Sequence, residues 1–182
     1  MSTLLSFCQW LAETPLSVQI RESNWTYPII ESVHVLGLCL FVGLLLLWDL
    51  RLVGITLRRV AVSEVWRRLI PWIALGAVIM VVSGLLLFAS DPVRFYGNIF
   101  FRIKAIGLLL ALLNALAFHF GVERQLKGWD MADVTPRAAR VAGAVSILLW
   151  AVIGLDTLAM RKSESGWTFT FFSRLAWPKP RA

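Results

Sequence analysis

Long apolar stretches alternate with short polar ones along most of the chain. Four of these stretches are about 20 residues long, the length that an α-helix needs to cross the roughly 30 Å hydrocarbon core of a bilayer. The predicted spans are residues 27–48, 69–89, 98–120 and 138–160. Because they take up most of the 182 residues, we expect one integral membrane domain over residues 1–182. The predicted fold is all-α, a transmembrane up-down four-helix bundle.

The segments around these spans have their own patterns. Residues 3–13 have the pattern of a short amphipathic N-terminal helix that lies in the membrane interface, and Pro15 is expected to end it. The dipeptide Asp91-Pro92 predicts a short loop between the second and third spans. After the fourth span, "SESGW" is expected to break the helix ahead of the aromatic strip "WTFTFFSRLAW", which suits the membrane interface.

Composition and charge agree with a membrane protein. Apolar residues make up 58% of the chain, against roughly 45–50% in soluble domains. The net charge of +7 does not indicate a nucleic-acid partner, because the basic residues flank the spans instead of forming one stripe. Five arginines lie between the first two spans, whereas Arg21 is the one basic residue before the first span. The positive-inside rule therefore predicts a multi-pass protein whose first loop lies in the cytoplasm and whose termini both lie outside.

A few ionisable residues lie inside the predicted spans, where lipid is a costly environment for them. Glu31 and His34 are three residues apart and so share one face of the first span. Gly37 lies one turn further along that face and is expected to leave an opening beside the imidazole. In the third span, Lys104 and His119 are expected to face roughly the same side of the bundle.

Depth decides which of these residues can act together. At about 1.5 Å per residue from the outer ends of their spans, His34 is about 10 Å deep and Lys104 about 9 Å, whereas His119 is about 32 Å deep. One subunit therefore cannot hold one haem iron between His34 and His119. The group expected to line one polar cavity near the outer surface is Glu31, His34, Lys104 and Asp156, with Arg102 among the arginines at its mouth.

Each of these residues also has a purely structural interpretation. His34 can be a buried histidine that is satisfied by Glu31 or by a backbone carbonyl. Lys104 can extend to the headgroups from its position near the outer end of the third span. Asp156 can serve to neutralise Lys104, and His119 can be an interfacial histidine at the inner boundary.

The order of the segments resembles an uncharacterised family of small bacterial inner-membrane proteins. The likeness covers about residues 5–155 and is carried by "NWTYPIIESVHVLGLCLFVGLLLLWDLRLVG", "RRLIPWIALGAVIMVVSGLLLFA" and "YGNIFFRIKAIGLLLALLNALAFHFG". In the fourth span, members of that family usually read like "AGRLIAY" where this chain has "GLDTLAM". Asp156 is therefore a departure from the family pattern.

More distantly, the layout resembles the HemJ-type protoporphyrinogen oxidases and the CopD-type copper-resistance membrane proteins. Both are small bundles with a first-span histidine before a glycine-rich stretch and a lysine that opens a later span. HemJ-type proteins are associated with a b-type haem. By this resemblance, His34 is expected to be a haem ligand, and Lys104 a second ligand, a substrate contact or a partner of the haem propionates.

We therefore expect a membrane-embedded b-type haem protein that takes part in electron transfer or redox chemistry near the periplasmic face, with a quinone or a membrane redox partner. His34 would ligate the iron, and Glu31 would fix the tautomer of the imidazole. His119 would ligate a second haem or meet another subunit of a homo-oligomer. Two alternatives stay open: HemJ-like oxidation of a porphyrin or quinone, and an accessory subunit of a larger membrane complex. Copper handling is not favoured, because the chain has no Met-rich or Cys-rich path.

Overall fold

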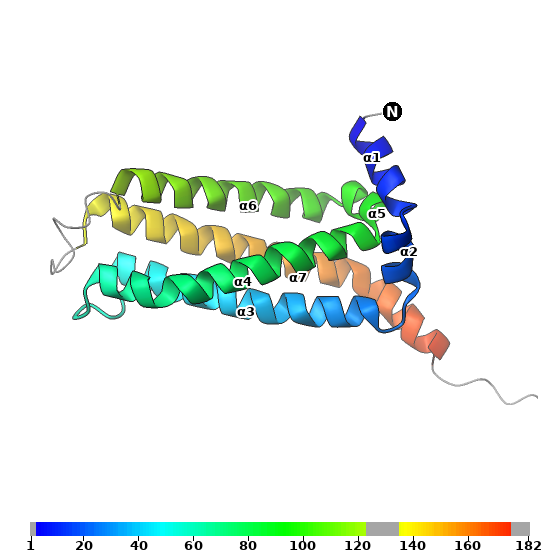
Figure 1. Cartoon of the computed structure of the whole chain (residues 1–182), viewed down its shortest axis with the longest axis horizontal. Helices are drawn as coiled ribbons and strands as arrows, with labels where there is room; N and C mark the ends of the chain where they lie inside the picture. Colours follow the sequence, from blue (N-terminus) through cyan, green and yellow to red (C-terminus); the bar gives the residue numbers. More distant parts are fainter. Residues whose placement is uncertain (1–2, 123–134, 176–182) are drawn as a thin grey trace, which may run out of the picture.

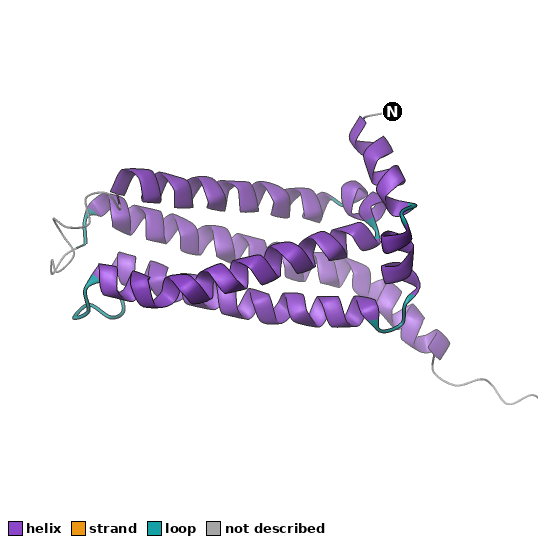
Figure 2. Ribbon diagram, viewed as in Figure 1, coloured by secondary structure: helices purple, strands orange, loops and turns teal. Residues whose placement is uncertain are grey.

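The computed structural model describes residues 3–122 and 135–175, with side chains described as far as Thr157. Within these residues every regular element is helical, and the loops are short connections (Figure 2). Four helices are long and apolar enough to cross a membrane: α3 (Thr26–Val53), α4 (Val62–Ser90), α6 (Ile99–Ala117) and α7 (Arg137–Leu175). The predicted all-α fold and the multi-pass membrane character are thereby confirmed.

The long helices lie side by side and alternate in direction (Figure 1). α3 packs against both α4 and α7, and α7 also packs against α6. In the described part of the chain, α4 and α6 do not pack along their lengths, so neighbouring helices follow the order α4, α3, α7, α6. The rings of Phe88 and Phe101 nevertheless join α4 to α6 near one end, with centroids 5.5 Å apart. The bundle is therefore more open between α4 and α6 than on its other sides.

Glycines allow α3 and α4 to approach closely. A Cβ atom added at Gly76 would lie 2.9 Å from the backbone nitrogen of Phe41, and one added at Gly37 would lie 2.6 Å from Cγ2 of Ile79. Side chains are thus excluded at both positions by the facing helix. The expectation that Gly37 leaves an opening beside His34 is wrong, because Ile79 fills that space and Gly37 serves helix packing.

Short helices gather at one end of the bundle, which we call the N-terminal end. They are α1 (Thr3–Ala12), α2 (Pro15–Glu22) and α5 (Pro92–Gly97), and α1 and α2 run across the long helices (Figure 1). The helix expected over residues 3–13 is confirmed as α1. Its large side chains Leu4, Phe7 and Trp10 are more than half exposed, as a helix in the membrane interface requires.

Two of these short helices were not predicted, and both begin at a proline. Pro15 does end α1, but it also occupies the first position of α2, which proline favours because its φ is fixed near the helical value. The hydroxyl of Thr14 caps α2 by accepting from the backbone N–H of Ser17 at 3.4 Å. Asp91-Pro92 begins α5 in the same way, so this dipeptide is a helix start and not only a turn.

The opposite end of the bundle, which we call the loop end, contains the main buried cluster. Its buried residues are Trp48, Leu52, Val62, Val65 and Ala139. Arg51 is only 3% exposed, and its guanidinium donates two hydrogen bonds to the carbonyl of Val60, at 3.2 and 2.9 Å. These bonds hold the α3–α4 connection against the end of α3. After α6, a π-helical turn over Phe118–Val122 packs next to the cluster.

α7 is longer than the predicted fourth span. It continues without interruption to Leu175, so the expected break at "SESGW" is wrong. A single glycine costs a helix about 1 kcal/mol relative to alanine, which does not suffice to end one whose neighbouring residues favour it. The side chains of the aromatic strip that follows lie outside the described residues, and its place at the interface stays a prediction.

Candidate functional site

His34 lies in the half of α3 nearest to the N-terminal end and faces α4. Its Nδ1 atom is 2.8 Å from Oγ of Ser83, which in turn donates to the carbonyl of Ile79 at 2.5 Å. A hydroxyl group has one proton, so Ser83 can only accept from the imidazole. Nδ1 therefore carries the ring proton and donates it, and Nε2 keeps a lone pair. This is the tautomer in which a histidine binds a metal through Nε2.

The other contacts of His34 leave the far side of its ring available. The side chain is partly buried, and no described residue forms a hydrogen bond with Nε2. Gly84 makes room for the ring, because a Cβ atom added there would lie 3.3 Å from Cε1. The imidazole is thus held from one side by α4 and has an unused ligand atom.

Glu31 does not have the role that the sequence suggested for it. Its side chain is exposed, whereas Ser83 is 4% exposed and occupies the Nδ1 atom of His34. The expectation that Glu31 fixes the imidazole tautomer is therefore wrong. Ser83 was not among the predicted site residues.

Lys104 and Asp156 lie on two further helices of the bundle, α6 and α7. Lys104 of α6 is close enough for its charge to act on His34, and Asp156 acts in the same way on Lys104. Asp156 of α7 is 8% exposed, and its Oδ2 atom has no hydrogen-bond partner among the described residues. Among the residues that the structure describes, Lys104 and Asp156 do not form a salt bridge with each other. Charges on three helices thus act on one another here, and the polar cavity that these residues were expected to line stays a prediction.

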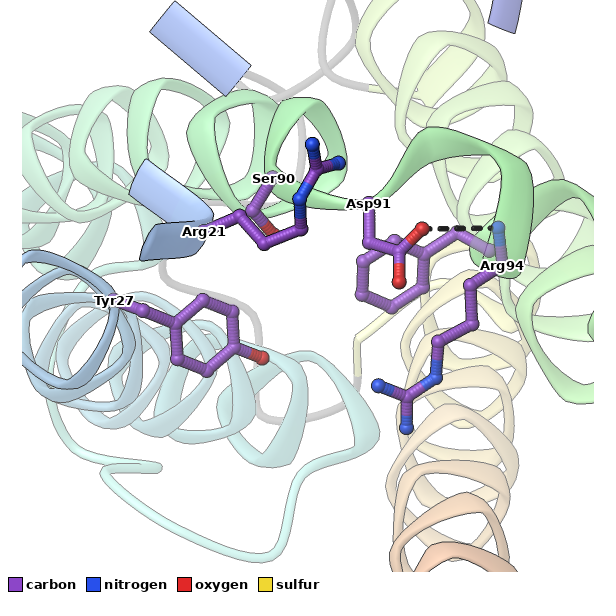
Figure 3. Close-up of a pocket in the computed structure, with 6 residues that line it drawn as sticks. Arg21, Tyr27, Ser90, Asp91 and Arg94 are labelled. Atoms are coloured by element: carbon purple, nitrogen blue, oxygen red, sulfur yellow. Dashed lines mark hydrogen bonds between the residues drawn. The ribbon is translucent and has the colours of Figure 1, made fainter. Parts of the chain in front are cut away.

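A pocket of about 120 Å³ lies further along the same α3–α4 contact, at the N-terminal end (Figure 3). Its lining residues are Arg21, Tyr27, Ser90, Asp91, Arg94 and Phe95. Tyr27 precedes His34 by seven residues on α3. Ser90 follows Ser83 by the same number on α4. Seven residues are about two helical turns, or about 10.5 Å, so the pocket and the imidazole lie on one line along the two helices.

The remaining predicted site residues lie elsewhere. Arg102 donates from Nε to the carbonyl of Tyr96 at 3.1 Å, and its guanidinium lies 5.3 Å from the centroid of that ring. It does not line the pocket. His119 lies in the π-helical turn at the loop end, with its ring 5.1 Å from that of Phe120. His34 and His119 therefore lie toward opposite ends of the bundle, as their depths predicted.

The described residues contain no group of three or more His, Cys, Asp or Glu side chains arranged to hold a metal ion. A site that holds a metal by protein ligands alone, as structural zinc sites do, needs about four of them. A haem needs only one or two, because the macrocycle supplies the other four. The donor set at His34 fits the second case.

A family model described as "Family of unknown function (DUF6644)" matches residues 11–158. No curated protein and no solved structure matches the chain. The match agrees with the likeness to a small membrane-protein family, and the likeness to HemJ-type and CopD-type proteins stays a prediction.

Proposed function

The chain belongs to the DUF6644 family of unknown function, and we propose that it is a membrane-embedded b-type haem protein that transfers electrons or takes part in redox chemistry. The observation that carries the proposal is the state of the His34 imidazole. Its Nδ1–H is bound to Ser83, and its Nε2 lone pair is unused. A hydrogen bond on the second ring nitrogen orients a metal-binding histidine and raises its basicity. His34 would therefore be the residue that binds the haem iron.

Lys104 and Asp156 would complete the surroundings of the haem. The amine of Lys104 would serve as a second ligand or as the cationic partner of a propionate. Asp156 would balance the charge of Lys104 in a region that excludes water. When bound, the haem would supply one-electron chemistry, and the protein would supply the ligand, the nearby charges and an apolar environment.

The size of the pocket bears on where the macrocycle would lie. Pockets that enclose small molecules usually measure about 300–1,000 Å³, whereas the pocket at the N-terminal end, which His34 does not line, measures about 120 Å³ and is too small to enclose a haem. The haem would therefore rest against the helices and share its other face with lipid or with a second subunit. This favours a homo-oligomer, or association with a membrane redox partner, over an isolated chain.

The charge distribution gives the proposed orientation. The α3–α4 connection and the start of α4 carry Arg58, Arg59, Arg67 and Arg68 at the loop end. This end would face the cytoplasm of a bacterial inner membrane, and the N-terminal end would face the periplasm. His34 would then hold the haem near the periplasmic surface, on the side where a quinone in the bilayer or a membrane redox partner would meet it.

One observation favours a second function. Because α4 and α6 do not pack along their lengths in the described residues, the bundle has a more open side on which a helix of another protein would pack. A chain without cofactor would then be an accessory subunit of a larger membrane complex. The two functions differ in whether the purified chain contains haem.

The direct test is an oxidised-minus-reduced absorption spectrum of the full chain purified from cells supplied with a haem precursor. We expect the bands of a b-type haem and a pigment extract with about one haem per chain or per dimer. A folded protein that contains no haem under these conditions would contradict the proposal and favour the accessory subunit.

Removing the Ser83 hydroxyl should weaken haem binding without removing the ligand. In Ser83→Ala the His34 Nδ1–H loses its acceptor, so the ring is free to rotate and to change its tautomer. Loss of such a supporting hydrogen bond lowers metal affinity about 10–100-fold. Haem titration of the apoprotein measures this change. Ser32→Ala is the matched control, because the Ser32 hydroxyl is exposed and bonds only the carbonyl of Pro28 within its own helix.

A further inference from the structure

The pocket at the N-terminal end is built by segments that are far apart in the sequence. Arg21 comes from α2, Tyr27 from the start of α3 and Arg94 from α5. In Figure 3 these three side chains border one opening, and the Tyr27 hydroxyl points into it. Their placement therefore depends on how α2 and α5 fold over the ends of α3 and α4.

The lining of the pocket is cationic. It contains two guanidinium groups and one carboxylate, that of Asp91, so its formal net charge is positive. Oδ1 of Asp91 accepts from the backbone N–H of Arg94 at 3.4 Å, which ties the carboxylate to the start of α5 (Figure 3). A guanidinium presents paired N–H donors that match the oxygens of a phosphate or a carboxylate, and a tyrosine hydroxyl can add a further donor.

The position of the pocket along the bundle indicates where its ligand comes from. Tyr27 is the second residue of α3, and Ser90 is the last residue of α4, so the pocket lies where two spanning helices end. Trp25, 77% exposed, lies beside it in the sequence. Exposed tryptophans of this kind are typical of the headgroup level of a bilayer. The pocket therefore lies near the depth of the lipid phosphates.

We propose that the pocket lined by Arg21, Tyr27 and Arg94 binds an oxyanion at the membrane surface, namely the phosphate of an anionic lipid headgroup or the carboxylate of a bound haem. Its volume of about 120 Å³ suits one such group. Binding of a haem carboxylate rests on the proposed function, in which the haem lies at His34, about 10.5 Å away along α3. Binding of a lipid phosphate does not depend on haem.

The test compares two variants of the full chain in detergent. The first is the double variant Arg21→Gln with Arg94→Gln. The second is Arg102→Gln, a control that removes an arginine at the same end which does not line the pocket. Each protein is titrated with phosphatidylglycerol or phosphatidylcholine while its thermal stability is measured, and its haem content is determined by absorption. If the double variant does not fold, Arg21→Gln alone replaces it.

We expect the apparent affinity of the double variant for phosphatidylglycerol to fall at least tenfold, or about 1.4 kcal/mol, with unchanged affinity for phosphatidylcholine. This result with normal haem content identifies a lipid phosphate as the ligand. Loss of haem with unchanged response to phosphatidylglycerol identifies the haem carboxylate. Equal behaviour of the double variant and Arg102→Gln in both measurements would overturn the proposal. Absence of haem from every protein would contradict the proposed function and leave the lipid measurement to decide the oxyanion site.

Discussion

The His34→Ala variant is expected to fold, to enter the membrane and to contain no haem. The substitution removes the one described imidazole whose Nε2 is unused and whose Nδ1 is held by a neighbouring helix. Without this imidazole, a haem would be held only by Lys104 and by apolar contacts with the helices. We expect the bound haem per chain to fall at least tenfold, measured by absorption and by pigment extraction. The His34→Gly variant should regain its absorption bands when free imidazole is added.

The matched control for this experiment is His119→Ala. His119 lies in the turn at the loop end and has other contacts within the chain. If there is one haem at the N-terminal end, this variant keeps its full haem content. Equal partial loss in both variants would instead indicate two haems, one near each end. Full retention of haem in His34→Ala would contradict the assignment of this ligand.

The Gly76→Leu variant is expected to lose the stable contact between α3 and α4. A Cβ atom at position 76 would lie 2.9 Å from the nitrogen and 3.0 Å from the Cα of Phe41. These are backbone atoms, so α3 itself has to move away. Overpacking commonly costs about 1–3 kcal/mol and more where the neighbours cannot yield, and we expect a loss of at least about 3 kcal/mol. Unfolding in a graded series of denaturing detergent measures it.

Gly43→Leu supplies the comparison for Gly76→Leu. Nothing lies within 4 Å of a Cβ atom added at Gly43, which faces outward from α3. Both substitutions gain about 1 kcal/mol of helix propensity, so this effect cancels between them. Gly43→Leu should therefore be at least as stable as the unmodified protein. Similar stabilities of the two leucine variants would show that the close approach at Gly76 does not limit stability.

The absorption spectrum of bound haem in Gly76→Leu should also change, because His34 and Ser83 belong to the same contact between α3 and α4.

Much of the fold followed from the apolar pattern, and its failures have identifiable causes. Span length and hydropathy are properties of single segments, so the four spans were predicted well. The helices that begin at Pro15 and Pro92 were missed because a proline after Thr or Asp was treated only as a break. Such a pair also satisfies the cap and first position of a new helix. The break expected after the fourth span does not occur, because one glycine does not suffice to end a long helix.

Counting residues along the spans predicted the parts of the candidate site that depend on depth alone. It missed the residues whose role depends on how the helices pack against one another. His34, Lys104 and Asp156 were placed at one level by counting residues, and the structure brings them together. Ser83 was missed because a serine on an apolar helix does not reveal which helix it faces. A signal was present in the residue numbers. Ser83 lies seven residues before the end of α4, and His34 lies seven residues after Tyr27 at the start of α3, so the two side chains have similar depths. Arg21 was missed because the fold of α2 over the bundle is a tertiary feature.

The uninterrupted course of α7 has a mechanical consequence. Its 39 residues give a rod about 58 Å long, against about 40–45 Å for a bilayer with its headgroups. The helix therefore projects beyond the N-terminal end of the bundle (Figure 1). No hinge separates this projection from Asp156, so a pull or a tilt applied to it by a neighbouring molecule moves the carboxylate with it. We therefore expect a tilt of the projecting segment to shift the position of the Asp156 carboxylate within the bundle.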